Sequence, residues 1–207
     1  MLAPGPSTSV VIRPLHPFSP NCLHMPTAGS TIQLFATALD SNGLIVSTTF
    51  TWSSDNAGVA TVNSSTGVVT GVANGICNIQ AQANDSGAAK SSIAVGVALL
   101  SANTISLAYG NTTTISSVGG FNTANWCGGC PGAAEVVAGT IVNGFVVNSA
   151  DPSLGWNPGP TCTIFTPLYT GPIGSTATAH VPIFASVGGI YCMATANITG
   201  VPNWAGA

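Results

Sequence analysis

Two cysteines three positions apart form the most distinctive chemical pattern in this chain. Cys127 and Cys130 stand in the segment Trp-Cys-Gly-Gly-Cys-Pro, residues 126–131. A Cys-x-x-Cys pair at a helix N-terminus has a lowered thiol pKa and can exchange disulfides. No helical periodicity follows Pro131, because Gly132 leads into only a short Ala-rich stretch. A structural disulfide within a loop is therefore favoured over a redox site.

The other cysteines do not complete a typical zinc pattern. Structural zinc sites usually combine two close ligand pairs. Cys127 and Cys130 would form one pair, but Cys162 and Cys192 are widely separated in the sequence. We therefore expect no zinc site in the second half of the chain.

Histidines offer a second candidate metal site. His16, Cys22 and His24 lie close together in a Pro-rich segment and could in principle bind a transition metal. His180 lies in a strand-like segment without an acidic neighbour in sequence, so packing is favoured over catalysis there. We expect no metal and no cofactor.

Carboxylates are few and isolated. No Asp-x-Asp run indicates calcium, no carboxylate pair indicates glycoside hydrolysis, and no nucleophile elbow or phosphate-binding loop is present. The sequence therefore predicts no catalytic residues and no enzyme. The five acids are Asp40, Asp55, Asp85, Glu135 and Asp151.

Aromatic side chains are the remaining candidates for ligand contact. Trp156 stands in a turn-rich loop with several Pro and Gly residues. Together with Trp126 and Tyr169 it could form a platform on which sugar rings or an apolar partner stack. The alternative is that Trp156 covers the open end of a β-sandwich, and we favour this alternative.

Composition excludes several classes of protein. Charged residues make up 3% of the 207 residues, against roughly 25% in ordinary soluble domains. The only cations are Arg13 and Lys90, so electrostatic binding to nucleic acid is not expected. The mean hydropathy is +0.47, yet no uninterrupted apolar run of about 18 residues indicates membrane insertion. A hydrophobic content of 45% argues against disorder.

Six cysteines in a β-rich chain indicate disulfides and an oxidising compartment. Residues 1–6 lack the basic and apolar regions of a signal peptide. We therefore expect an exported protein, extracellular or at the cell surface, whose leader is not part of this chain.

Short β-branched strands separated by turn residues dominate residues 50–81. Trp52 stands in a Thr/Phe-rich strand, and residues 59–62 and 68–70 read Val-Ala-Thr-Val and Val-Val-Thr. Residues 75–81 alternate, so that Cys77, Ile79 and Ala81 share a face. This series resembles the bacterial immunoglobulin-like domain of group 2, the repeat of invasin/intimin-type surface proteins. The resemblance covers about residues 10–98. Within it, Ile32, Leu34, Ala36 and Ala38 alternate inward, and Asn42-Gly43 indicates a tight turn before the Trp52 strand. The resemblance implies that the Trp52 strand is central in its sheet and that the Trp packs between the sheets, and it carries no chemistry with it.

Two all-β domains are expected in tandem. The first spans residues 1–98 and has a Pro-rich insertion at 14–26. The second, residues 99–207, is read as a divergent Ig-like β-sandwich with loop insertions. Residues 105–115 repeat the family's opening, and Gly189 to Ala196 repeat Gly75 to Ala83, again with a cysteine in the strand. Since the chain ends soon after Cys192, we expect a final strand that is short or missing.

The resemblance also suggests how the cysteines pair. Cys22 precedes the second strand of the sandwich, and Cys77 stands where the family usually has a small residue, which implies a bond between them. Such a bond would contribute about 4 kcal/mol. The expected pairs in the second half are Cys127–Cys130 and Cys162–Cys192, one of three possible connectivities.

These observations predict a non-enzymatic structural or adhesive protein, and the scarcity of charges favours a subunit of a filament or matrix built from identical copies. The alternative is a carbohydrate-binding or lectin-like module that uses the aromatic loops of the second domain. Expected partners are other copies, other surface proteins or glycans. Neither nucleic acid nor membrane insertion is expected.

Overall fold

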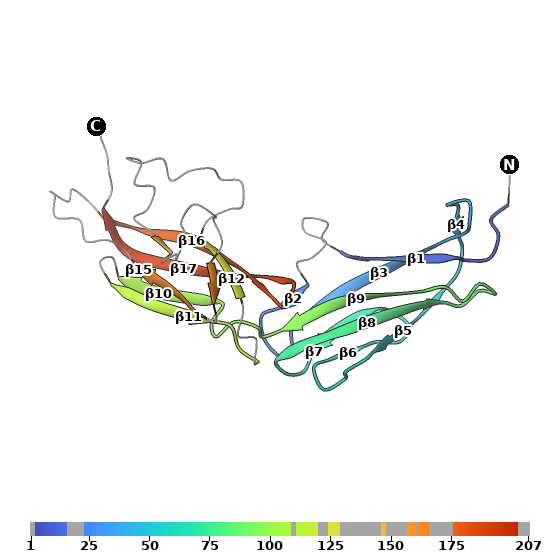
Figure 1. Ribbon diagram of the computed structural model, residues 1–207, viewed down its shortest axis with the longest axis horizontal. Helices are drawn as coiled ribbons and strands as arrows, with labels where there is room; N and C mark the ends of the chain where they lie inside the picture. Colours follow the sequence, from blue (N-terminus) through green and yellow to red (C-terminus); the bar gives the residue numbers. More distant parts are fainter. Residues whose placement is uncertain are drawn as a thin grey trace. The chain divides into compact units, whose positions relative to one another are not determined.

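The computed structural model describes residues 3–15, 23–108, 111–119, 124–128, 146–147, 157–159, 161–165 and 176–202. Within these ranges the chain forms strands and no helix. The chain divides into two compact units, Met1–Leu99 and Leu100–Ala207 (Figure 1). Each unit is built from its own sheets.

Unit 1 is a sandwich of two sheets. One sheet has the order β1-β3-β7-β6, with β4 also paired to β3, and the other has the order β2-β9-β8-β5. The strands are β1 (Ser9–Pro14), β2 (His24–Met25), β3 (Thr31–Leu39), β4 (Ile45–Val46), β5 (Phe50–Ser54), β6 (Ala60–Val62), β7 (Val68–Gly71), β8 (Gly75–Ala83) and β9 (Lys90–Val97). The only parallel pair among them is β2 with β9; β1 lies antiparallel to β3.

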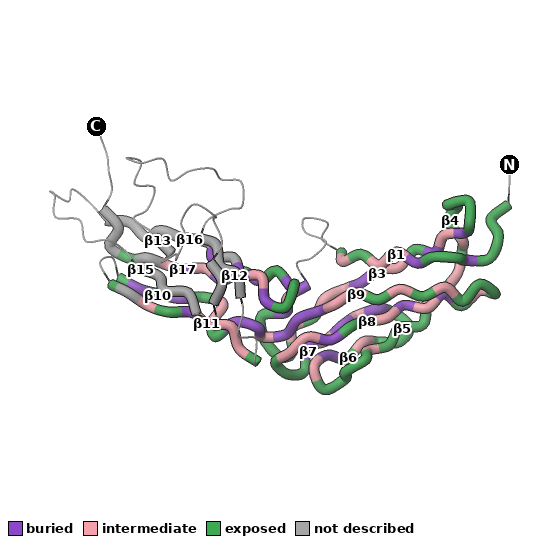
Figure 2. The backbone as a smooth tube through the Cα atoms, viewed as in Figure 1, coloured by how far each residue is buried: buried purple, intermediate pink, exposed green. Residues whose placement is uncertain are grey.

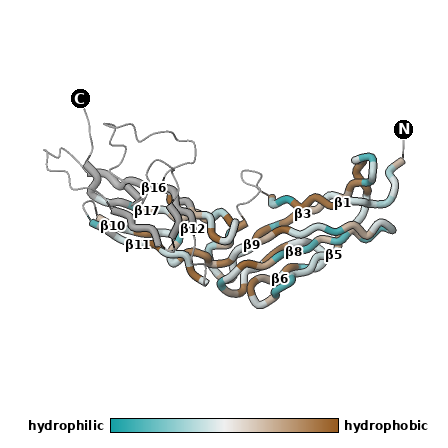
Figure 3. Tube along the Cα trace, in the orientation of Figure 1, coloured by the Kyte–Doolittle hydropathy of each residue, from teal (hydrophilic) through white to brown (hydrophobic). Residues whose placement is uncertain are grey.

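Alternation along the strands separates the core from the surface, as the sequence predicts. On β3, Leu34 and Ala38 are buried while Phe35 and Thr37 are exposed. On β8, the residues at 77, 79, 81 and 83 are all buried. Figure 2 shows this change from buried to exposed positions along the tube, and Figure 3 shows the hydrophobic stretches of β3 and β9. Because side chains of a strand alternate between its faces, one face of each sheet supplies the core.

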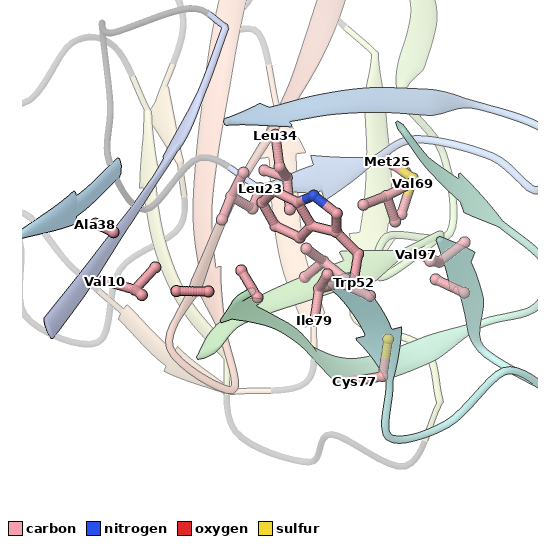
Figure 4. Packing of buried hydrophobic residues seen from close by; sticks show 14 residues of the cluster. Val10, Leu23, Met25, Leu34, Ala38, Trp52, Val69, Cys77, Ile79 and Val97 are labelled. Atoms are coloured by element: carbon pink, nitrogen blue, oxygen red, sulfur yellow. The ribbon is translucent and has the colours of Figure 1, made fainter. Parts of the chain in front are cut away.

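Trp52 lies inside this core. It is 5% exposed, and its ring lies among Leu23, Leu34 and Ile79 in Figure 4. The expectation that its strand is central in the sheet is wrong: β5 ends the hydrogen-bonded order and pairs only with β8 among the described strands. A loop borders the other edge of β5, and there the Trp52 N–H donates to the Ser64 carbonyl at 2.9 Å.

Unit 2 also has two sheets. One has the order β10-β17-β16-β12-β14 and the other the order β11-β15-β13. Its strands are β10 (Thr104–Ala108), β11 (Thr112–Ser116), β12 (Ala124–Gly128), β13 (Val146–Val147), β14 (Asn157–Gly159), β15 (Thr161–Phe165), β16 (Thr176–Val187) and β17 (Ile190–Pro202). Buried residues alternate on β17 at 190, 192, 194 and 196, as the sequence predicts.

The described residues include no strand after the one that contains Cys192. The strand that contains Cys192 is itself the last described strand, β17, and it runs for 13 residues. It joins β16 through a two-residue turn, Gly188-Gly189, in which both glycines have positive φ. Turns of this kind match the right-handed twist of a hairpin. The long β16–β17 hairpin therefore forms the interior of the larger sheet of this unit, between β10 and β12.

Candidate functional site

Asp40 holds a turn together. It is 4% exposed, and its carboxylate accepts hydrogen bonds from the backbone N–H groups of Gly5 (3.0 Å), Asn42 (2.8 Å) and Leu44 (2.9 Å). These donors, the Gly5 N–H first and the Leu44 N–H next, hold the pKa of Asp40 below its ordinary value. The carboxylate thus fixes both the β3–β4 turn and the segment before β1. The predicted Asn42-Gly43 turn is confirmed, with Gly43 at φ 77°.

Asp85 and Asp55 play similar parts. Asp85 accepts from both the hydroxyl and the backbone N–H of Ser7, each at 2.6 Å, and the Ser7 hydroxyl in turn accepts from the Ala89 N–H at 3.3 Å. Asp55 accepts from the side-chain amide and the backbone N–H of Asn78, each at 2.8 Å. Hydrogen bonds from Ser7 and from Asn78 lower the pKa of the respective carboxyl. These carboxylates are therefore structural acceptors rather than acid–base groups.

His24 secures the point where the chain leaves unit 1. Its Nε2 accepts a hydrogen bond from the Leu99 N–H at 3.1 Å, and the neighbouring Met25 carbonyl accepts from the Ala98 N–H at 2.8 Å. Burial lowers the pKa of His24 from 6.5 to about 4. The ring is therefore neutral near pH 7, as an acceptor Nε2 requires. Because this nitrogen is occupied, His24 is poorly placed to bind a metal.

Cys77 is a buried thiol. It is 3% exposed and free, and burial raises its pKa, while the Ser54 hydroxyl donates to its sulfur at 3.9 Å. Its predicted partner, Cys22, lies outside the described residues, as does His16. The structure therefore gives no support to the Cys22–Cys77 bond, which stays a prediction.

The cysteines of the second half occupy three strands. Cys127 lies on β12, Cys162 on β15 and Cys192 on β17, while Cys130 falls outside the described residues. The buried Cys192 thiol donates to the Ile190 carbonyl at 3.6 Å. No disulfide is present within the described part of the chain, so both predicted pairs of this half stay predictions.

Only one of the three predicted ligand-contact aromatics falls on a described element. Trp126 lies on β12 directly opposite Ala185 of β16, whose side chain is fully buried. Trp156 and Tyr169 lie outside the described residues, so the platform stays a prediction.

Metal binding and membrane crossing each require a particular arrangement of residues. Among the described residues no group of three or more His, Cys, Asp or Glu side chains could hold a metal ion. In the same residues there is no helix of the length and hydrophobicity that crossing a membrane requires.

Sequence reasoning missed one surface feature. The exposed Arg13 on β1 lies directly opposite Phe35 on β3, and Phe35 is 50% exposed. This pair could not be found without the β1–β3 register, because the two residues are far apart in sequence and their pairing depends on how the strands align.

Comparison with known proteins agrees with the fold of unit 1. Residues 27–95 match the family described as bacterial Ig-like domain (group 2), which confirms the resemblance over that range. No curated protein sequence matches the chain.

Solved structures show weak similarity. The S-layer protein rSbsC(31-844) is 14% identical, with 96% of this chain and 29% of that chain covered and a TM-score of 0.35. A C-terminal 282-residue fragment of intimin, in complex with the intimin-binding domain of its translocated receptor, is 16% identical, with 47% and 36% covered and a TM-score of 0.33. A structure of the three N-terminal domains of the highly immunogenic outer capsid protein (Hoc) of bacteriophage RB49 is 13% identical, with 93% of this chain and 70% of that chain covered and a TM-score of 0.33. This chain thus spans less than a third of the rSbsC chain.

Proposed function

We propose that the protein is a non-enzymatic structural or adhesive protein of the cell surface or the extracellular space, and that it works as a subunit of a filament or matrix of identical copies. The family matched by residues 27–95 supports the location. In this proposal, residues 99–207 form a second, divergent Ig-like sandwich in tandem with the first.

One observation carries the non-enzymatic reading. In unit 1, the three carboxylates and the one described histidine are all engaged in holding turns and chain segments. A general acid or base must have a proton-transfer position open to substrate. In the described part of unit 1 these groups are instead directed at backbone N–H groups and small polar side chains.

The surface supports association between copies. On the outer face of the β5–β8–β9 sheet, hydroxyl and amide side chains lie opposite one another: Thr51 faces Gln82, Ser53 faces Gln80, and Gln80 faces Ser92. Lys90 lies opposite Gln82 on this face, and a surface with so few charges has little self-repulsion. Such faces suit close packing through hydrogen bonds and apolar contacts.

The test is the state of assembly of the purified full chain. We expect filaments or higher oligomers by electron microscopy and by sedimentation at increasing protein concentration. Raising the salt concentration from about 50 to about 500 mM shortens the screening length to a few ångströms and should barely weaken them. A clean monomer at high concentration, or association that is lost steeply with salt, would contradict the proposal.

Disulfides are part of the proposal because an exported protein of this composition would use them. Peptide mapping without reduction should find Cys22–Cys77, Cys127–Cys130 and Cys162–Cys192. A bond from Cys22 to any cysteine beyond residue 100 would contradict the division into two separately stapled domains.

A further inference from the structure

The outer face of the β1–β3 pair differs from the rest of the described surface of unit 1. Directly opposite residues form three rows on it: Val11 with Thr37, Arg13 with Phe35, and Leu15 with Gln33, where the Leu15 N–H donates to the Gln33 carbonyl at 3.1 Å. Phe35 is 50% exposed and Leu15 is 57% exposed. A cation, an aromatic ring and an aliphatic side chain are thus gathered on one open sheet face.

Among the described residues, no carboxylate binds Arg13. Within the described residues its guanidinium forms no ion pair and no hydrogen bond, and the acids of unit 1 are occupied by backbone N–H groups, Ser7 and Asn78. A guanidinium presents five N–H donors in a planar fork that matches a carboxylate. This face therefore offers guanidinium donors that no carboxylate of the described residues binds.

Phe35 supplies the other half of a binding surface. Its β-carbon and that of Arg13 should be about 5 Å apart, as in other directly opposite pairs. An aromatic ring offers a flat apolar surface to which the C–H face of a pyranose can pack. A sugar ring that carries a carboxylate could then pack on Phe35 while its carboxylate binds the Arg13 fork.

We propose that the Arg13–Phe35 face binds acidic polysaccharide through its uronic acid residues. The Thr37 hydroxyl, which makes no hydrogen bond within the described part of the chain, lies in the neighbouring row and is available to a sugar hydroxyl. This inference adds a ligand to the structural role and holds whether or not the protein polymerises.

The composition of this face favours a saccharide over a protein partner. Arg13 is its one cation and Phe35 its one aromatic ring among the described strands. The other large apolar groups are aliphatic and spread over neighbouring strands: Val11, Leu15, Leu39, Ile45 and Val68. A single ring and a single cation match one sugar unit, and many copies on a surface would raise a weak affinity through multivalency.

Affinity electrophoresis of the full chain in gels that contain polygalacturonate tests the proposal, with trigalacturonic acid as the soluble probe in titrations. We expect Arg13→Gln and Phe35→Leu each to weaken binding at least 5-fold. Arg13→Lys should weaken it by a smaller factor, because it keeps the charge and loses the fork. Lys90→Gln removes the other cation, on the opposite sheet, and is the matched control that should bind as the unchanged protein does. Equal melting temperatures show that the variants are folded.

Three comparisons decide the outcome. Fully methyl-esterified polygalacturonate keeps the sugar and loses the charge, and should not retard the protein. Equal retardation by dextran sulfate, together with an equal effect of Lys90→Gln, would show general anion binding and overturn the proposal. Equal binding to poly-glutamate would indicate an acidic protein partner and would also overturn it, as would an unchanged protein that does not bind polygalacturonate. None of these results depends on the state of assembly.

Discussion

Strands β8 and β17 share a sequence pattern but have different positions in their sheets. Each carries a buried cysteine, Cys77 or Cys192, shortly after a glycine. β8 lies inside its sheet between β5 and β9, and β9 then pairs in parallel with β2. β17 pairs with the preceding β16 and, in parallel, with the first strand of its unit, β10. By its pairing, β17 corresponds to β9 and not to β8.

Alternation of buried and exposed residues specifies the buried face of a strand but not its neighbours in the sheet. Side chains that alternate every second residue show which residues of a strand face the core, and this face was predicted correctly for both β8 and β17. The same period says nothing about which strand lies beside which. Equating Gly189–Ala196 with Gly75–Ala83 therefore matched the buried faces of the two strands but not their neighbours in the sheet.

The two units also differ in charge. Residues 1–99 hold both cations and three acids, whereas residues 100–207 hold no cation and two acids, Glu135 and Asp151. In unit 1 the acids fix turns, so its stability should respond to pH. If the two units unfold separately within one molecule, a substitution or a pH change that destabilises one unit should leave the unfolding transition of the other in place.

Truncating Trp52 should have the largest effect. Trp52→Ala removes the ring that fills the centre of the unit 1 core and should cost about 3–5 kcal/mol. That is a large part of the stability of a domain of this size. Calorimetry should show the first unit unfolding early while the second transition stays in place.

A matched control for this change is Phe35→Ala, which truncates a half-exposed aromatic residue in the same unit and should cost much less. If Trp52→Ala kept the melting profile of the unchanged protein, or if both transitions moved together, the separation of the two units would be wrong.

Much of unit 1 could be predicted from sequence because its information is local. Turn residues such as Asn42-Gly43 and the alternation around Leu34 depend on neighbours in the chain, and the structure confirms both. Pairings between distant strands do not: the edge position of β5 depends on how the sheet is assembled. For the same reason the Arg13–Phe35 pair was not predicted, and neither was the hydrogen bond between His24 and Leu99.

Gly67→Ala should have the next largest effect. A β-carbon at this position would lie 2.8 Å from the Trp52 ring and 2.8 Å from the Leu34 carbonyl oxygen. The residue also has φ +73°, which is unfavourable for other residues. Overpacking and backbone strain together should lower the stability of unit 1 by about 2–4 kcal/mol.

Gly43→Ala is the control that isolates the strain, because Gly43 has φ +77° and nothing lies within 4 Å of a β-carbon there. An equal effect of the two substitutions in denaturant unfolding would show that Trp52 does not pack against the turn at Gly67.

Acid should destabilise unit 1 through His24. The pKa of His24 is about 4 in the folded protein and 6.5 ordinarily, so the unfolded chain takes up a proton first as the pH falls. Stability should therefore decline from about pH 6.5 to about pH 4, by up to about 3 kcal/mol. The aspartates act in the same direction but at lower pH: their lowered pKa values contribute stability above their ordinary pKa, and it is lost only as the pH falls through the folded values, below about 4.

Denaturant unfolding at several pH values measures this decline. His24→Gln should flatten the dependence of the unit 1 transition between pH 6.5 and 4 and leave the loss below pH 4. A slope that is the same in the variant would show that His24 does not carry the effect. The second transition is an internal reference, since residues 100–207 contain a single histidine, His180.

The smallest expected effect falls on unit 2. Gly189 has φ +81° in the tight turn that joins β16 to β17, and nothing lies within 4 Å of a β-carbon there. Gly189→Ala should therefore cost only the strain of a left-handed backbone, about 1–2 kcal/mol, and should move only the second transition. The turn sets the register of the β16–β17 hairpin, which belongs to unit 2. A shift of the first transition would therefore mean that β17 stabilises unit 1 as well. That result would contradict the correspondence between β17 and β9, because β9 pairs only with strands of its own unit, β2 and β8.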